Sequence, residues 1–170
     1  MLTDTEKASI VRIWNDRIPL PGGCLPGTKL IDPSKIDWLQ SQGWTVDVHH
    51  APASGAVDAF LLYKPEKGRA MMGLSLAPSD EVHFELFMRF ANWAKSQGLE
   101  DAFSPKQPGD SIEYERCAKV GIPIVTVRAE VKKVIDGTEH TWPAKFEFQM
   151  KTDDLIRSLE ALGVKNSNNA

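Results

Sequence analysis

The sequence predicts a single α+β domain over residues 1–164, with a mainly antiparallel sheet packed by helices. Three observations predict this class. Apolar residues with a helical period alternate with shorter apolar runs, the runs follow one another through tight turns, and a chain of 170 residues has enough apolar side chains for one core. The expected order is α-α-β-β-β-α-(α)-β-β-α, followed by a disordered tail at 165–170.

The N-terminal part is expected to contain two helices. Thr3 and Glu6 have the spacing of a capping box, in which a hydroxyl and a carboxylate satisfy each other's free backbone amides. Residues 19–27 contain three prolines and three glycines, so the first helix gives way to a long loop. Asp32 followed by proline then predicts the start of a short helix, and Gly43 predicts its end.

Three strands and the longest helix follow. Residues 44–50 alternate between apolar and polar side chains, which is the period of a half-buried strand. Residues 56–64 and 69–77 are two more apolar runs separated by a turn that contains proline and glycine, so the three strands are expected to form an antiparallel meander. Ser79 predicts the next helix start and Gly98 its end.

The C-terminal part is expected to hold a loop, a short helix, a hairpin and a last helix. The loop covers 99–110 and the short helix 111–120. The hairpin spans 122–150 and turns at Asp136-Gly137, a pair that tolerates the positive φ angles of a type I′ turn. Thr152 is expected to cap the last helix.

A two-residue turn at Asp136-Gly137 also sets the register of this hairpin. Counting outward from the turn places apolar residues opposite one another on one face, as a half-buried strand pair requires. The expected pairs are Ile135 with Thr138, Val131 with Trp142, Val127 with Phe146, and Val125 with Phe148.

Composition excludes several classes of protein. The chain has 20 Lys and Arg residues against 23 Asp and Glu, which does not suit a protein that neutralises nucleic-acid phosphates. Cys24 and Cys117 are too far apart to form a local redox or zinc pair, and no apolar run reaches the length of a membrane span. No signal-peptide pattern is present, so a cytoplasmic protein is expected. No residue pattern indicates a cofactor or a metal, so neither is expected.

Few residues suggest chemistry. Asp47 and His49 lie two apart on the expected outward face of the first strand, where a carboxylate and an imidazole share one side. Cys117 is a further, weaker candidate as a thiol nucleophile. Gly22 to Lys29 is similar to a phosphate-binding loop, but its last two residues are in the wrong order and no strand precedes it.

The order of elements resembles two known architectures. PD-(D/E)xK nucleases share the succession helix, three strands, helix, and need an acid on the second strand and an acid-x-Lys pair on the third. Asp58 would supply the first acid, but residues 71–76 contain no acid, and Glu130-Val131-Lys132 lies on a different hairpin. An active nuclease is therefore not expected. The order of elements also resembles the dimeric secretion chaperones of bacteria, as an analogy of fold alone.

The leading functional expectation is a small binding module for another protein, such as an inhibitor, immunity or chaperone-type accessory protein of a bacterium or its mobile elements. It depends on Phe84, Met88 and Ala91, which form a second apolar stripe beside the main apolar stripe of the longest helix, since apolar area exposed on a helix marks an interface. The alternative is that this stripe is core beneath the loops. A homodimer is the simplest alternative use of that stripe. The rival expectation is a small hydrolase or metal-dependent enzyme that uses Asp47 and His49. The expected partner-binding residues are Phe84, Met88, Ala91, Arg128, Lys132 and Lys145.

Overall fold

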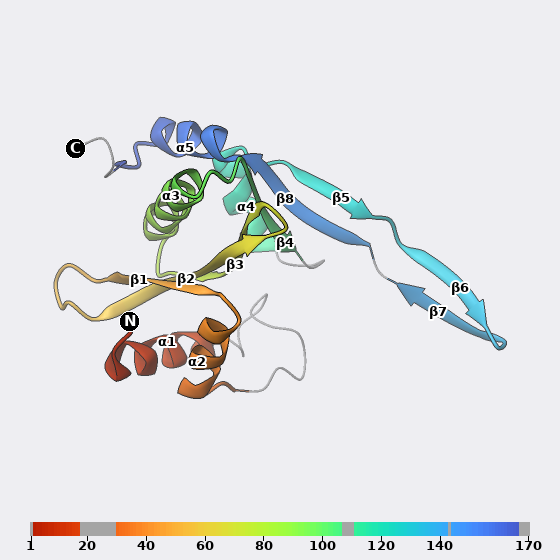
Figure 1. The fold of residues 1–170 in the computed structure, drawn as a ribbon, viewed down its shortest axis with the longest axis horizontal. Helices are drawn as coiled ribbons and strands as arrows, with labels where there is room; N and C mark the ends of the chain where they lie inside the picture. The colour runs from red at the N-terminus through yellow and green to blue at the C-terminus, as the bar shows by residue number, and fades with distance from the viewer. Residues whose placement is uncertain (1, 18–29, 107–110, 143, 167–170) are drawn as a thin grey trace.

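A six-stranded sheet forms the centre of the structure, and helices cover both of its faces (Figure 1). The computed structural model describes residues 2–17, 30–106, 111–142 and 144–166, so the loop expected at 19–27 lies outside the described residues. Over the part of the chain that is described, the protein is a single α+β domain, as predicted.

The described residues contain five helices and eight strands. The helices are α1 (Asp4–Arg17), α2 (Pro33–Ser41), α3 (Asp80–Ser96), α4 (Ser111–Val120) and α5 (Thr152–Ala161). The strands are β1 (Thr45–His50), β2 (Val57–Glu66), β3 (Arg69–Leu76), β4 (Asp101–Lys106), β5 (Ile124–Arg128), β6 (Val131–Ile135), β7 (Thr138–Trp142) and β8 (Lys145–Lys151).

Most of the expected helix ends are confirmed by side-chain caps. The Thr3 amide donates to the Glu6 carboxylate at 2.7 Å, and the Glu6 amide donates to the Thr3 hydroxyl at 3.2 Å, which completes the capping box of α1. The Ser79 hydroxyl accepts from the backbone amide of Val82 at the start of α3. Thr152 differs from the prediction, because its hydroxyl donates to the Leu99 carbonyl instead of capping α5.

The sheet has the strand order β1-β2-β3-β4-β8-β5. Its first three strands form the predicted antiparallel meander. β4 then lies beside β3 and runs parallel to it, because α3 carries the chain back across the sheet (Figure 1). β8 pairs antiparallel with β4 on one side and with β5 on the other. The β3-α3-β4 crossover is the one parallel unit among the described strands.

The prediction of a loop over 99–110 is wrong for residues 101–106, which form β4 in the middle of the sheet. The only apolar residues of this strand are Ala102 and Phe103, a run too short to signal a strand, and Pro105 argues against one. Strand formation here depends on partners that are far away in sequence. β3 and β8 supply those partners and outweigh the weak local preference.

The C-terminal hairpin keeps the predicted register only near its turn. Asp136 and Gly137 have φ angles of 50° and 80°, and the expected pairs of Ile135 with Thr138 and of Val131 with Trp142 form. Further out, the register shifts between Thr126 and Arg128. Phe146 and Phe148 consequently face Thr126 and Ile124, one residue away from the expected valines. An extra residue in one strand produces this slip, and no turn pattern reveals it.

β6 and β7 form a separate two-stranded sheet that extends away from the domain (Figure 1). Its apolar residues are therefore not covered by the body of the protein. Val134 is 69% exposed and Ile135 45% exposed. The predicted burial of one face of the hairpin is wrong for this outer part, because no helix lies against it (Figure 1).

Two hydrophobic clusters lie on opposite faces of the sheet. The smaller cluster joins α1 and α2 to β1 and β2, and the larger one joins α3, α4 and α5 to β2, β3, β4 and β8. The second stripe of α3 belongs to the larger cluster: Phe84 is 9% exposed, Met88 2% and Ala91 0%. The exposure expected of this stripe is wrong, because α5 and the segment after it cover that side of α3.

The segment that follows α5 runs back along α3. Asn92 Nδ2 donates to Asn166 Oδ1 at 2.9 Å, so the first residues of the expected tail at 165–170 are held against the helix, and 167–170 lie outside the described residues. Among the described helices, none combines the length and the apolar character needed to cross a membrane.

Candidate functional site

The parallel pair of β3 and β4 creates a fork in the sheet. The two strands pair at Ala70 with Ala102 and at Met71 with Phe103, and then continue to Leu76 and Lys106 without further paired positions in the described ladder. In sheets with a parallel crossover, ligands bind at the carboxyl ends of such strands, where the connections lead away in different directions. A ligand-binding site is therefore expected at the fork.

Ser104 lies one residue beyond the last position at which β4 pairs with β3, at the base of the fork. Its side chain is 1% exposed, and its hydroxyl oxygen has no hydrogen-bond partner among the described residues. Beside it is a cavity of about 20 Å³, lined by apolar side chains that include Met72, Phe90 and Phe148. A buried hydroxyl without a partner is costly, so it marks a position where a bound group with a polar atom would complete the structure.

Ion pairs connect the start of α3 to α4 next to the fork. Asp80 accepts from Arg116 Nε at 3.2 Å and from Lys119 Nζ at 2.5 Å. The hydrogen bond from Lys119 has the largest effect on the pKa of Asp80 and lowers it. Burial opposes this shift, Arg116 lowers the pKa further, and the net result is a lowered pKa. Asp80 is therefore a carboxylate at neutral pH, and the exposed Glu81 is the next residue of the same turn.

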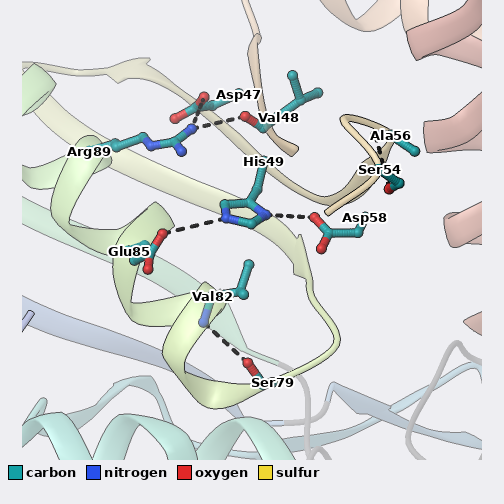
Figure 2. Close-up of polar contacts among 10 residues, drawn as sticks. All are labelled: Asp47, Val48, His49, Ser54, Ala56, Asp58, Ser79, Val82, Glu85 and Arg89. Atoms are coloured by element: carbon teal, nitrogen blue, oxygen red, sulfur yellow. Dashed lines mark hydrogen bonds and ion pairs between the residues drawn. The ribbon is translucent and has the colours of Figure 1, made fainter. Parts of the chain in front are cut away.

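A second polar cluster surrounds His49 and joins β1 and β2 to α3 (Figure 2). His49 Nδ1 lies 2.6 Å from Asp58 Oδ1, and its Nε2 lies 3.5 Å from Glu85 Oε2. The three residues come from the end of β1, the start of β2 and the second turn of α3. His49 is 8% exposed, whereas the Glu85 side chain is 53% exposed, so the cluster reaches solvent through Glu85.

The prediction for Asp47 and His49 is right about their shared face of β1 and wrong about the exposure of that face. Both side chains point to the same face of β1, but that face is covered by α3 and is not open to solvent (Figure 2). Asp47 pairs with Arg89 at 3.1 Å, and Arg89 also donates to the Val48 carbonyl at 2.9 Å. Burial raises the pKa of Asp47, and Arg89 opposes this shift without cancelling it.

A surface groove of about 930 Å³ opens along α3 beside this cluster. Glu81, Glu85 and Arg89 line it from α3, and residues 162–165 line it from the opposite side. The His49 imidazole lies between the Asp58 and Glu85 carboxylates, and Glu85 connects this cluster to the groove. Catalytic roles for Asp47 and His49 stay predictions.

The remaining candidates lie elsewhere. Cys117 is 0% exposed within the larger core cluster, so its thiol does not reach the surface. Lys132 and Lys145 are exposed on β6 and β8, and Arg128 lies at the end of β5. These three basic residues do not form one surface with the α3 stripe, which is buried. Their role in binding a partner, and a homodimer, stay predictions.

Sequence reasoning did not find Ser104, Asp80 or Glu85 as site residues. Ser104 was part of an expected loop, and only the long-range pairing of β4 places it in the core. Asp80 lies in the first turn of α3, where a negative charge is favourable in any helix, and its pairing with α4 depends on the tertiary fold. The spacing from His49 to Glu85 across two strands and a turn gives no local signal.

No protein-family model matches the sequence, and no curated protein resembles it significantly. Similar solved structures do exist. A ribosomal-protein-alanine N-acetyltransferase from Brucella melitensis matches with a TM-score of 0.63 and 14% identity, covering 88% of this chain and 96% of that one. A phosphinothricin acetyltransferase from Sinorhizobium meliloti, in complex with acetyl-CoA, matches with a TM-score of 0.60 and 12% identity over 88% of this chain and 85% of that one.

The PaiA N-acetyltransferase of Thermoplasma acidophilum, in complex with coenzyme A, gives a TM-score of 0.61 and 11% identity, covering 88% of this chain and 96% of that one. At these identities the likeness establishes the fold. The chain is therefore a protein with the N-acetyltransferase fold.

This finding corrects the functional expectations. The inhibitor, immunity or chaperone-type binding module is contradicted, because nearly the whole chain has the fold of enzymes that transfer acetyl groups. The expectation that leaned against an enzyme is wrong for the same reason. The alternative of a hydrolase or metal-dependent enzyme built on Asp47 and His49 is not supported either, since the similar structures are acetyltransferases.

Proposed function

We propose that the protein is an N-acyltransferase, which moves an acyl group from a thioester to an amine. The observation that carries the proposal is the fork between β3 and β4 with the partnerless hydroxyl of Ser104 at its base. The fold supports the proposal, because solved structures named as acetyltransferases match 88% of this chain.

The Ser104 hydroxyl suits the charge that develops during acyl transfer. The amine nitrogen forms a bond to the carbonyl carbon, the carbon–sulfur bond breaks, and one proton passes from the nitrogen to the departing thiol. Negative charge gathers on the carbonyl oxygen in between. A fixed donor in a water-excluded place stabilises that oxygen most strongly, and Ser104 is 1% exposed among apolar side chains.

The residues present fit one end of an acetyl-CoA donor. The cavity of about 20 Å³ beside Ser104 offers space on the scale of one small group, such as the methyl end of an acetyl group. The acidic first turn of α3 does not fit the diphosphate at the other end. When a thioester is bound, it supplies the activated acyl group, and Ser104 orients the carbonyl.

The test is a transfer assay on the full chain. Purified protein is incubated with acetyl-CoA or acetyl-pantetheine and a panel of primary amines that includes peptide N-termini, and acetylated products are measured by mass spectrometry. Ser104→Ala is expected to lower kcat about 100-fold with little change in KM for the amine, as loss of an oxyanion donor does.

The matched control is Ser75→Ala. Ser75 is a buried serine of the neighbouring strand β3, but its hydroxyl already has a partner in His83 Nδ1 at 2.7 Å. This variant should keep its kcat at temperatures where it is folded. Absence of transfer by folded wild-type protein, or equal kcat for wild type and Ser104→Ala, would refute the proposed function.

A further inference from the structure

The first turn of α3 follows the end of β3 and lies at the mouth of the fork. The free amides at a helix N-terminus carry partial positive charge, and a strand followed by a helix commonly holds phosphate groups there. Coenzyme A, which similar structures contain as such or as acetyl-CoA, carries a nucleotide diphosphate beyond its thiol arm. The charges at this turn therefore decide whether such a donor fits.

In this chain the turn is occupied by the protein's own carboxylates. Asp80 and Glu81 are its first two residues, and they are negatively charged where a diphosphate would need positive charge. The nearby cations are already engaged, because Arg116 and Lys119 both donate to Asp80. The Arg116 side chain is only 11% exposed, so it is held in this pairing between α3 and α4.

The connection into the helix also leaves little room for a phosphate. Residues 77–79 link β3 to α3, and they are Ala77, Pro78 and Ser79. Phosphate-binding turns use glycine so that the backbone can approach the anion, and this link has no glycine. Pro78 has no amide to donate, and the Ser79 hydroxyl already accepts from the Val82 amide.

We propose that this chain takes its acyl group from a thioester donor that carries no nucleotide diphosphate. The inference rests on the acyl transfer proposed above and adds the class of donor. Acetyl-pantetheine is the probe of that class, since it shares the thioester and the arm of acetyl-CoA and lacks the diphosphate. Asp80 and Glu81 exclude the larger donor by repulsion and by holding Arg116 and Lys119.

Calorimetric titration of the full chain tests this directly. Wild-type protein should bind coenzyme A no more tightly than pantetheine. The double variant Asp80→Asn with Glu81→Gln removes both negative charges and the ion pairs that Asp80 makes with Arg116 and Lys119, so its affinity for coenzyme A should rise about tenfold, while its affinity for pantetheine stays the same. A double variant with no gain, or a wild type that prefers coenzyme A tenfold or more, would overturn the inference.

Two further variants make the result specific. Asp153→Asn with Asp154→Asn removes the same charges from the first turn of α5, away from the fork, and should leave the affinity for coenzyme A unchanged. Glu81→Gln keeps the ion pairs of Asp80 intact and adds no positive charge, so it tests the repulsion alone if the double variant does not fold. A gain in affinity for coenzyme A in this variant supports the inference, and no gain overturns it.

The donor class and the proposed function fail in different ways. A folded chain that transfers acetyl from neither acetyl-pantetheine nor acetyl-CoA refutes acyl transfer. A chain that transfers acetyl from acetyl-CoA with a kcat/KM at least tenfold higher than from acetyl-pantetheine supports acyl transfer and overturns the donor class. A higher kcat/KM for acetyl-pantetheine supports the donor class, and equal use of both donors overturns it, because Asp80 and Glu81 then do not exclude the diphosphate.

Discussion

Replacing Ser104 with alanine is expected to leave the protein equally stable or to make it more stable. A buried hydroxyl without a partner costs about 1–3 kcal/mol, because it has lost its hydrogen bonds to water and gained none. The Ser104 side chain is 1% exposed, and its oxygen has no partner among the described residues. The Ser104→Ala variant removes that oxygen and keeps the β-carbon, so the free energy of unfolding should rise by up to about 2 kcal/mol.

The comparison with Ser75 makes this expectation specific. Ser75 and Ser104 are both buried serines in adjacent strands, but Ser75 bonds His83 Nδ1 at 2.7 Å. Ser75→Ala removes that bond inside the core and should lower the free energy of unfolding by about 1–3 kcal/mol. The same substitution is thus expected to act in opposite directions on β3 and β4.

Urea unfolding followed by tryptophan fluorescence measures both effects, since the chain contains five Trp residues. A loss of more than about 1 kcal/mol in Ser104→Ala would show that the hydroxyl has a partner in the free protein. That result would refute the inference that the Ser104 hydroxyl is an unused hydrogen-bond donor at the fork. A stable Ser104→Ala variant with reduced kcat is the signature of a residue retained for function.

Three further outcomes are expected. Gly73→Ala places a Cβ 2.7 Å from Trp44 Cζ3 and should cost about 1–3 kcal/mol in thermal unfolding, and Trp44→Leu in the same chain should recover part of the loss. Because burial raises the pKa of Asp47, its contribution to stability is present below the unfolded pKa and is lost as pH rises through the raised value. The stability of wild type minus that of Asp47→Asn, measured in urea, should therefore fall as the pH rises above about 4, the ordinary pKa of an aspartate. Val134→Thr, on the exposed β6, should change stability by less than about 0.5 kcal/mol, and a larger loss in the melting temperature would indicate a hidden contact.

The features that could be predicted from the sequence are those that short segments decide by themselves. The capping box at Thr3 and Glu6 and the turn at Asp136-Gly137 need only a few neighbouring residues, and both form as expected. The meander is of the same kind, because its strands follow one another through short connections. Local chemistry therefore accounts for most of the helices and for half of the sheet.

The features that could not be predicted depend on partners distant in the sequence. β4 exists because β3 and β8 flank it, and its own residues would equally suit a loop. The wide apolar surface of α3 is buried under α5, although the same pattern fits an exposed interface. For the site, periodicity placed Asp47 and His49 on one face, but their actual partners, Arg89, Asp58 and Glu85, come from elements that only the fold brings together.

The narrow pairing between β3 and β4 also affects how the protein moves. One half of the sheet is β1-β2-β3 and the other is β4-β8-β5, and only two paired positions, Ala70 with Ala102 and Met71 with Phe103, join them. Each half is held together by longer antiparallel ladders. The seam is therefore the least costly place for the sheet to open, and amide hydrogen exchange should proceed faster there than within either half. Such opening would widen the fork while each half keeps its shape, so the fold provides a hinge at the base of the candidate site.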